Sequence, residues 1–288
     1  MARLAVTGYA SLDYPVVLDG MVKADRTTHI RFRDPAAWPR AGGSPTYVAG
    51  AAAIAGIASA PVAWVGDDAL GAHYVDHCRA AGLDVSGLER HAGARSPAAI
   101  MIHQADGSTA CLYDPGPGGE ERLTAEQARL IAEADMACLT VGPGHLVEPI
   151  LAARPADRPL CWVMKDDPTC FGPESRAALA ARAGIIFCNA AERPLIGAVP
   201  AHTMIVETLG ADGVRLHAEN AVTALATEPV AVADPTGAGD SFAGAFIAAH
   251  LQGAGPEAAA RTAMEMVAAM LRARARRGQT MTDRGRGQ

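Results

Sequence analysis

The stretch DPTGAGDSFAGAFIAAH, residues 234–250, places two acids, a proline and two glycines directly before an apolar helix. Gly237, Ala238 and Gly239 leave backbone N–H groups uncovered at a helix N-terminus, a place that binds anions. A carboxylate beside such a site repels phosphate, unless it is there to take a proton from a nucleophile, which makes Asp240 a candidate base. An anion cradle beside a base is what phosphoryl transfer to a hydroxyl requires. Taken alone, GxGD is more often a turn followed by a helix cap.

Composition narrows the class of protein. The chain has 288 residues, 50% of them apolar and 19% charged, with a formal net charge of −6. This length and composition predict one large globular domain, or one domain with a small appendage. The net charge gives no reason to expect nucleic acid or an anionic membrane as a partner. The six cysteines form no CxxC and no zinc-spaced cluster, which indicates reduced thiols. No signal peptide and no apolar run near the roughly 20 residues of a membrane span is found, so we expect a soluble, cytoplasmic protein.

Strand-like and helix-like segments alternate along most of the chain, and this pattern predicts a doubly wound α/β fold. Short apolar runs that end at glycine are typical of buried strands, and the segments between them have the length of helices. The expected sheet is mostly parallel, with helices on both faces. The expected strands are 3–10, 61–66, 136–141, 160–164, 185–188 and a returning pair within 203–220, and the expected helices are 42–59, 69–83, 124–134, 145–153, 173–183, 238–252 and 256–275.

Two strand-like segments interrupt this alternation. Residues 14–33 mix β-branched and charged residues, and residues 97–113 contain two runs joined by Asp106-Gly107, a strong hairpin signal. We expect both segments to meet as a small β-sheet lid inserted into one domain of residues 1–275. The exposed edge of such a sheet invites pairing with a second copy, so a homodimer through the lid is a possible assembly. Residues 276–288 are expected to be a disordered basic tail.

Motifs in chain order resemble those of the ribokinase-like (PfkB) family of sugar and nucleoside kinases. DPTGAGDSFAGAF resembles the C-terminal signature of that family, and the resemblance covers about residues 3–275. It implies the ribokinase-like α/β fold with a β-sheet lid, and ATP and Mg²⁺ as cofactors. The other matching stretches are GYASLD (8–13), AGGSPTYVAGAAA (41–53), VGDDALGAHYVDHCRAAGLDVSGL (65–88), CNAAE (188–192) and ETLGADGV (207–214).

The resemblance implies roles at the reacting centre and on the acceptor side. Asp240 corresponds to the catalytic base, and the backbone of residues 237–239 to the anion hole. Asp13 corresponds to the carboxylate that binds acceptor hydroxyls, a group suited to a polyol. Gly42 and Gly43 would let the backbone approach the acceptor closely. Without the resemblance, a capping aspartate and a glycine turn explain these residues equally simply.

On the nucleotide side, the resemblance assigns residues from three separate motifs. Asn189 and Glu192 match the NxxE pair that the family uses around magnesium and the nucleotide phosphates. Asp234 matches the first acid of the C-terminal signature, and either loop order or a water on Mg²⁺ would explain it. The nucleotide loop corresponds to Thr208, Gly210 and Gly213, which alone would be a β-turn.

The sequence departs from the family pattern at three places, which affect the choice of acceptor and nucleotide more than the type of reaction. Tyr47 stands where the first signature carries an asparagine that binds the sugar, so the phenol would stack on a ring or narrow the pocket. Pro235 replaces a threonine and removes one N–H. The last helix lacks an asparagine near the adenine pocket, and Met264, Met266 and Met270 offer an apolar wall instead. No arginine cluster marks a phosphorylated acceptor, and the lid candidates His29, Arg31 and His103 are weak contacts, since such residues are usually solvated.

The predicted function is therefore an ATP-dependent phosphotransferase that moves the γ-phosphoryl group to a hydroxyl of a sugar, sugar derivative or nucleoside. The alternative is a non-catalytic sugar- or nucleotide-binding protein on the same fold, which the Tyr47 departure leaves open. A dinucleotide-dependent oxidoreductase is remote, because no early GxGxxG follows a strand. The sequence leaves the identity of the acceptor open.

Overall fold

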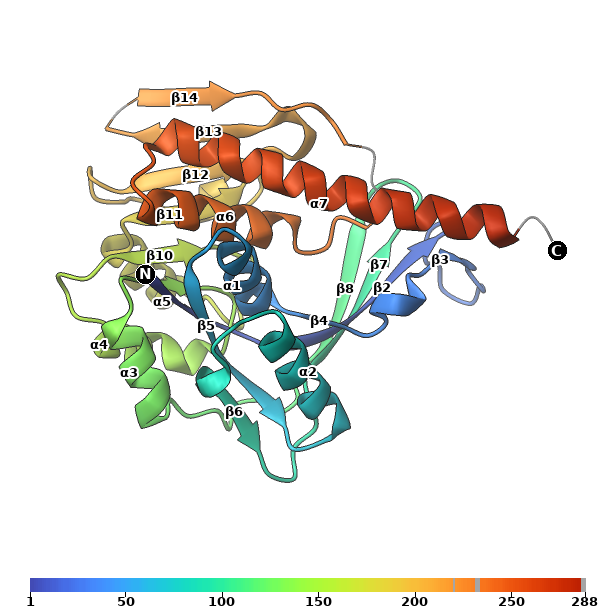
Figure 1. Ribbon diagram of the computed structural model, residues 1–288, viewed down its shortest axis with the longest axis horizontal. Helices are drawn as coiled ribbons and strands as arrows, with labels where there is room; N and C mark the ends of the chain where they lie inside the picture. Colours follow the sequence, from blue (N-terminus) through green and yellow to red (C-terminus); the bar gives the residue numbers. More distant parts are fainter. Residues whose placement is uncertain (220, 231–233, 286–288) are drawn as a thin grey trace.

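A nine-stranded sheet forms the centre of the protein (Figure 1). The structure, a computed structural model, describes residues 1–219, 221–230 and 234–285. The strand order is β14-β13-β12-β11-β10-β9-β1-β5-β6. Within this order, each neighbouring pair from β12 to β6 is parallel. β13 pairs antiparallel with β12, and β14 pairs antiparallel with β13. The strands are β1 (Arg3–Thr7), β5 (Ala58–Gly66), β6 (Leu88–His91), β9 (Met136–Leu139), β10 (Leu160–Val163), β11 (Ile185–Asn189), β12 (Met204–Thr208), β13 (Val214–Ala218) and β14 (Ala221–Leu225).

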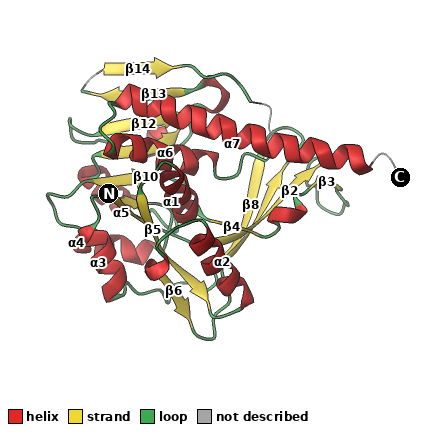
Figure 2. Cartoon of the chain, viewed as in Figure 1, coloured by secondary structure: helices red, strands yellow, loops and turns green. Residues whose placement is uncertain are grey.

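Helices cover both faces of this sheet (Figure 2). Because side chains alternate along a strand, Leu4 and Val6 of β1 belong to one buried cluster, and Ala5 between them belongs to the other. The first cluster includes side chains of α1 (Ser44–Ile54), α2 (Ala69–Ala80), α6 (Ala238–Leu251) and α7 (Pro256–Gly285). The second includes side chains of α3 (Ala125–Glu133), α4 (Val147–Ala153) and α5 (Pro173–Arg182). The single-turn 3₁₀ segments are Pro35–Ala37, Val85–Gly87, Gly144–Leu146, Arg193–Leu195 and Gly210–Asp212.

A second, smaller sheet stands beside the main one and is called the lid below (Figure 1). Its strand order is β3-β2-β7-β8, and β4 pairs with β2. Pairing of β2 with β7 joins the two segments predicted from the sequence, and β2 is mostly buried. The sequence prediction missed β4. The lid strands are β2 (Ser11–Leu18), β3 (Ile30–Phe32), β4 (Arg40–Gly42), β7 (Ala98–His103) and β8 (Thr109–Asp114).

The last helix is longer than predicted. α7 was expected to end at residue 275, but it continues to Gly285, and only residues 286–288 of the predicted tail lie outside the described part of the chain. No proline occurs between 275 and 285, and arginine is a good helix former, so the helix continues through this stretch in spite of Gly278. Within the described residues, none of the helices has the length and apolar character of a bilayer-crossing segment.

Candidate active site

The loop of residues 234–237 immediately precedes α6, which begins at Ala238. Gly237 has φ = 74°, in the left-handed region that favours glycine. The N–H of Ala238 donates to the carbonyl of Pro235 at 3.0 Å, so this predicted donor of the anion hole is already used in the turn. The N–H groups of Gly237 and Gly239 have no hydrogen-bond partner among the described residues. Two of the three predicted amides are therefore available to an anion at this helix N-terminus.

Asp240 lies in the first turn of α6, beside these amides. Its side chain is buried, with 9% of the residue exposed, and its Oδ1 atom has no hydrogen-bond partner within the described residues. An unpaired buried carboxylate oxygen is costly, and in native structures it marks a site kept for a ligand or a proton. The residue faces a cavity of about 370 Å³. The predicted base and the predicted anion hole are thus neighbours, as the sequence indicated.

This cavity, called the polar cavity below, lies between the lid and the carboxyl ends of the main strands. It brings together three of the predicted acceptor residues, Asp13, Gly43 and Tyr47. Five of its lining residues carry a carboxyl group and one carries an ammonium group. The lining residues are Tyr9, Ser11, Asp13, Gly43, Ser44, Tyr47, Ala99, Met101, Cys111, Tyr113, Val141, Lys165, Asp166, Asp167, Glu192, Thr236, Gly237 and Asp240.

Tyr47 holds the carboxylate of Asp13. Its phenol donates a hydrogen bond of 2.6 Å to Asp13 Oδ2. Burial raises the pKa of Asp13, and the hydrogen bond from Tyr47 opposes that rise. Gly42 backs the same carboxylate, because a Cβ at this position would lie 2.1 Å from Asp13 Oδ2. Gly42 therefore gives Asp13 its space, and Gly43 rather than Gly42 reaches the cavity.

The ring of Tyr47 also packs against the loop of the anion hole. A Cβ on Gly237 would lie 2.7 Å from ring carbons of Tyr47, so only glycine fits beneath the ring. Tyr47 thus spans the distance from Asp13 to Gly237 with one side chain. Of the two possibilities left by the sequence, the structure shows the second: the phenol fills space between Asp13 and Gly237 and narrows the polar cavity there.

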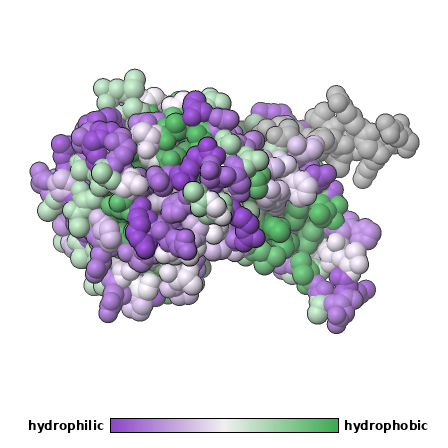
Figure 3. Space-filling view, turned by 90° about the horizontal axis from the view of Figure 1, so that it is seen from below, coloured by the Kyte–Doolittle hydropathy of each residue, from purple (hydrophilic) through white to green (hydrophobic). Residues whose placement is uncertain are grey.

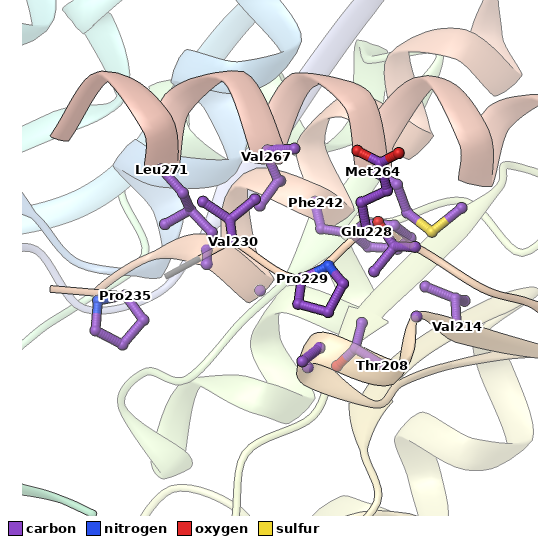
Figure 4. A pocket seen from close by; sticks show the side chains of 17 residues that line it. Thr208, Val214, Glu228, Pro229, Val230, Pro235, Phe242, Met264, Val267 and Leu271 are labelled. Atoms are coloured by element: carbon purple, nitrogen blue, oxygen red, sulfur yellow. The ribbon is translucent and has the colours of Figure 1, made fainter. Parts of the chain in front are cut away.

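A second cavity of about 310 Å³, called the apolar cavity below, lies on the other side of the same loop. Figure 4 shows Met264, Val267 and Leu271 of α7 facing it opposite Thr208 and Val214. The predicted nucleotide loop residues Thr208, Gly210 and Gly213 all line it. So do Pro235, Ala238 and Gly239, whereas Thr236, Gly237 and Asp240 line the polar cavity. The two cavities therefore meet at residues 235–240.

The NxxE pair folds into a small reciprocal turn after β11. Asn189 Oδ1 accepts the N–H groups of Ala191 and Glu192 at 2.9 Å, and Glu192 Oε2 accepts the N–H of Asn189 at 2.8 Å. Glu192 is buried and lines the polar cavity, together with Asp240 and Gly237. Asn189 lines neither cavity and caps the turn instead, in contrast to its predicted place on the nucleotide.

Asp234 is engaged by the lid. Its Oδ2 pairs with Nη2 of Arg40, and its Oδ1 lies 3.3 Å from Nε2 of His103 and accepts the N–H of Thr236 at 3.0 Å. Burial alone would raise the pKa of Asp234, but the bonds from His103 and Arg40 hold it far below the usual range. With both oxygens occupied, Asp234 does not fit the predicted metal ligand and fits the alternative role in loop order.

A metal site built from protein ligands alone would require a group of three or more histidine, cysteine, aspartate or glutamate side chains. The described residues contain no such group. Mg²⁺ does not need such a cage, because it usually binds one or two carboxylates together with substrate phosphates and water. Glu192 in the polar cavity fits that donor set. Asp234 does not.

Sequence reasoning missed several residues around the polar cavity and the loop of residues 234–237. Arg40 stands two residues before Gly42, the first of the double glycine, a position that could have drawn attention to it. Arg274 of α7 donates to the carbonyl of Thr236 at 2.6 Å, and nothing in its helical context marks it. Tyr9 and Tyr113 pack together with ring centroids 5.3 Å apart at the wall of the polar cavity, and only the tertiary fold brings them there.

The fold and the two cavities that meet at a helix N-terminus are those of a ribokinase-like α/β protein. The chain belongs to the pfkB family of carbohydrate kinases, whose model matches residues 1–281. It is 25% identical over 259 residues to the ATP-dependent ribose-1-phosphate kinase of Halopiger xanaduensis, covering 87% of this chain and 86% of that protein. The family recognition and the kinase class predicted from the sequence are thereby confirmed, and ATP use follows from the kinase family.

Solved structures agree on the fold. A putative ribokinase from Agrobacterium tumefaciens superimposes with a TM-score of 0.77 at 21% identity, over 93% of this chain and 90% of that chain. A ribokinase from Cryptococcus neoformans in complex with ADP gives a TM-score of 0.76 at 20% identity, over 93% of each chain. The predicted fold class, a mostly parallel sheet flanked by helices with a small second sheet, is confirmed.

Proposed function

We propose that the protein transfers the γ-phosphoryl group of ATP to a hydroxyl group of an unphosphorylated sugar, sugar derivative or nucleoside. The observation that carries this proposal is Asp240, a buried carboxylate with one unpaired oxygen, beside two free amides at the junction of two cavities. The apolar cavity suits a nucleobase, and the polar cavity suits a hydroxylated acceptor. The junction is where the phosphoryl group would pass from one to the other.

In the proposed step, Asp13 holds the acceptor and Asp240 takes the proton of its reacting hydroxyl. The acceptor oxygen forms a bond to the γ-phosphorus as the bond to the β–γ bridging oxygen breaks, and ADP leaves. The amides of Gly237 and Gly239 donate to the transferring phosphoryl group, whose charge they stabilise without reorganisation. The lid covers the polar cavity and limits the access of water, which would otherwise compete as the acceptor.

Magnesium would be held by Glu192 together with phosphate oxygens and water. Its carboxylate already accepts the N–H of Asn189, which fixes the side chain toward the polar cavity. When bound, the ion would neutralise charge on the phosphates. Asn189 then acts on the metal indirectly, by orienting Glu192.

The charges of the polar cavity favour a neutral acceptor. Its lining contains one cationic side chain, Lys165, against five carboxyl groups. Like charges in a confined site repel a phosphorylated acceptor, because close charges inside a protein interact more strongly than in water. The relative from Halopiger xanaduensis is named for a phosphorylated sugar, so phosphorylated and free acceptors belong in the same test.

The test is a screen of ADP release with ATP and Mg²⁺ against free sugars, sugar phosphates and nucleosides. We expect turnover with one or more unphosphorylated acceptors. Asp240→Asn keeps the shape of the side chain and removes the proton acceptor, so kcat should fall by about 10²–10⁴-fold with nucleotide affinity nearly unchanged. Binding of ligands without transfer to any acceptor would support the non-catalytic alternative. Near-normal turnover of the Asp240→Asn variant would mean that another group is the base.

The lid also offers a surface for a second copy of the chain, and we propose a homodimer through it. Ile100 and Leu112 are cross-strand partners on the outward face of β7 and β8, and they are 44% and 58% exposed. Ile30 of β3 is 51% exposed. Figure 3 shows a large hydrophobic surface on the lid side of the molecule. Exposed apolar patches of this kind are typical of association sites.

A further inference from the structure

We propose that Arg40 and His103 are positioning residues, which couple the lid to the anion-hole loop through Asp234. The proposal rests on the proposed phosphoryl transfer for its kinetic consequences, but its structural part does not depend on the acceptor. Nothing in the family match or in the relatives' names assigns a role to this network. Its three members come from β4, from β7 and from the loop before α6.

Arg40 is the stronger of the two lid anchors. Its ion pair with Asp234 is largely buried, with 12% of each side chain exposed. Arg40 is also the register partner of Asp13 across β4 and β2. The strand pair that carries the predicted acceptor carboxylate is therefore tied directly to the loop that carries the amides.

His103 attaches a second lid strand to the same loop. Its Nε2 atom lies 3.1 Å from the hydroxyl of Thr236 and 3.3 Å from Asp234 Oδ1. Its Nδ1 atom lies 2.9 Å from the hydroxyl of Thr109 in β8, which fixes the ring in its plane. The histidine is 5% exposed, so it is not the solvated side chain expected from its place on a lid strand.

These contacts set the direction of the free amides. Asp234 Oδ1 accepts the N–H of Thr236, and Arg274 of α7 donates a hydrogen bond to the carbonyl of Thr236. Residue 236 is thus held from both sides, immediately before Gly237. If the lid anchors are lost, the loop can rotate and the amides of Gly237 and Gly239 no longer converge on the junction of the cavities. Displacements of about 1 Å at a reacting centre cost about 10²-fold in rate.

A purely structural ion pair is the competing explanation, and Arg40 differs from the structural arginine of this chain. Arg154 places its guanidinium on five backbone carbonyls. Arg40 leaves Nε and Nη1 buried without a partner in the described residues, so the side chain is not arranged for maximal hydrogen bonding. Unsatisfied buried groups are rare in native proteins, and each one calls for an explanation.

The kinetic test compares Arg40→Met, Asp234→Asn and the double variant with Arg95→Gln. Arg95 forms an ion pair with Asp114 at the edge of the lid, 3.2 Å long and exposed, and serves as the matched control. For Arg40→Met we expect kcat to fall about 10- to 100-fold, with KM for ATP within about threefold of the wild-type value. The double variant should have a kcat no lower than that of the slower single variant, because Arg40→Met and Asp234→Asn each remove the same ion pair. Arg40→Lys, which keeps the charge, should recover much of the rate.

The structural test is backbone amide hydrogen exchange of the peptide that contains residues 234–240. Arg40→Met should accelerate its exchange at least tenfold, whereas Arg95→Gln should not, and peptides of β1 and β10 should be unchanged in both. This readout separates the two proposals: a wild-type protein that phosphorylates no acceptor would contradict the proposed function, while the exchange result still tests the coupling. Equal exchange in Arg40→Met and wild type, acceleration spread evenly over all peptides, or kcat within twofold of wild type would overturn the coupling.

Discussion

Removing the hydroxyl of Tyr47 should destabilise the protein in a pH-dependent way. In Tyr47→Phe the carboxylate of Asp13 loses its hydrogen bond of 2.6 Å from the phenol. Asp13 is buried, with 3% of the residue exposed. A hydrogen bond to a charged group contributes about 1.5–3 kcal/mol, and one to a neutral group about 0.5–1.5 kcal/mol. The free energy of unfolding at neutral pH should therefore fall by about 1.5–3 kcal/mol.

The sign of the pH dependence follows from the pKa of Asp13. Burial raises this pKa in the folded state, and the Tyr47 bond lowers it, so the variant has the higher folded-state pKa. An acid with a raised pKa costs stability above that pKa, and the cost disappears as the pH falls and the group is protonated in both states. The difference between variant and wild type should thus be largest above the raised pKa and should shrink by about 1 kcal/mol or more as the pH falls through it.

Urea unfolding of both proteins at neutral and at mildly acidic pH measures this difference. Tyr14→Phe is the matched control, because Tyr14 packs edge-on against Trp38 and its hydroxyl has no hydrogen-bond partner in the part of the chain that the structure describes. Its effect should stay within about 0.5 kcal/mol at either pH. A Tyr47→Phe effect that is independent of pH, or no larger than that of the control, would refute the assignment of the bond to an ionised Asp13.

Two further predictions concern the loop and the lid. Gly237→Ala places a Cβ 2.7 Å from the Tyr47 ring at φ = 74°, so stability should fall by about 1–3 kcal/mol and transfer to the acceptor should slow by at least tenfold; a variant with wild-type melting temperature and rate would show that the ring moves freely. Leu112→Glu puts a charge in the outward apolar face of the lid and should shift sedimentation at high concentration from dimer to monomer, whereas a wild-type chain that sediments as a monomer at every concentration would exclude the lid dimer.

Much of the fold could be predicted because its signals are local. Short apolar runs marked most of the parallel strands, and Asp106-Gly107 marked the hairpin between β7 and β8. The strands that were missed, β4, β6 and β14, have three to five residues and carry weak periodicity. Their pairing energy comes from neighbours that are distant in the sequence, so propensity alone could not reveal them.

The local geometry expected from the sequence is present where a motif fixes the backbone, and it differs where side chains choose distant partners. Gly237 adopts the left-handed conformation at the start of α6, and Asp240 follows in the first turn. Asp234 has the residue type of a metal ligand, yet a guanidinium from the lid takes its carboxylate. Asn189 has the type of a ligand-binding amide, but its nearest unpaired donors are the amides of its own turn.

The sequence by itself determined the family, the alternation of strands and helices, and the glycine-rich entry to α6, because each of these depends on residues that are close along the chain. Only the tertiary structure decided that Tyr47 reaches both Asp13 and Gly237, and that Arg40 and His103 converge on Asp234. These contacts join residues far apart in the sequence. Their energies depend on burial and distance, which exist only after the two sheets have come together.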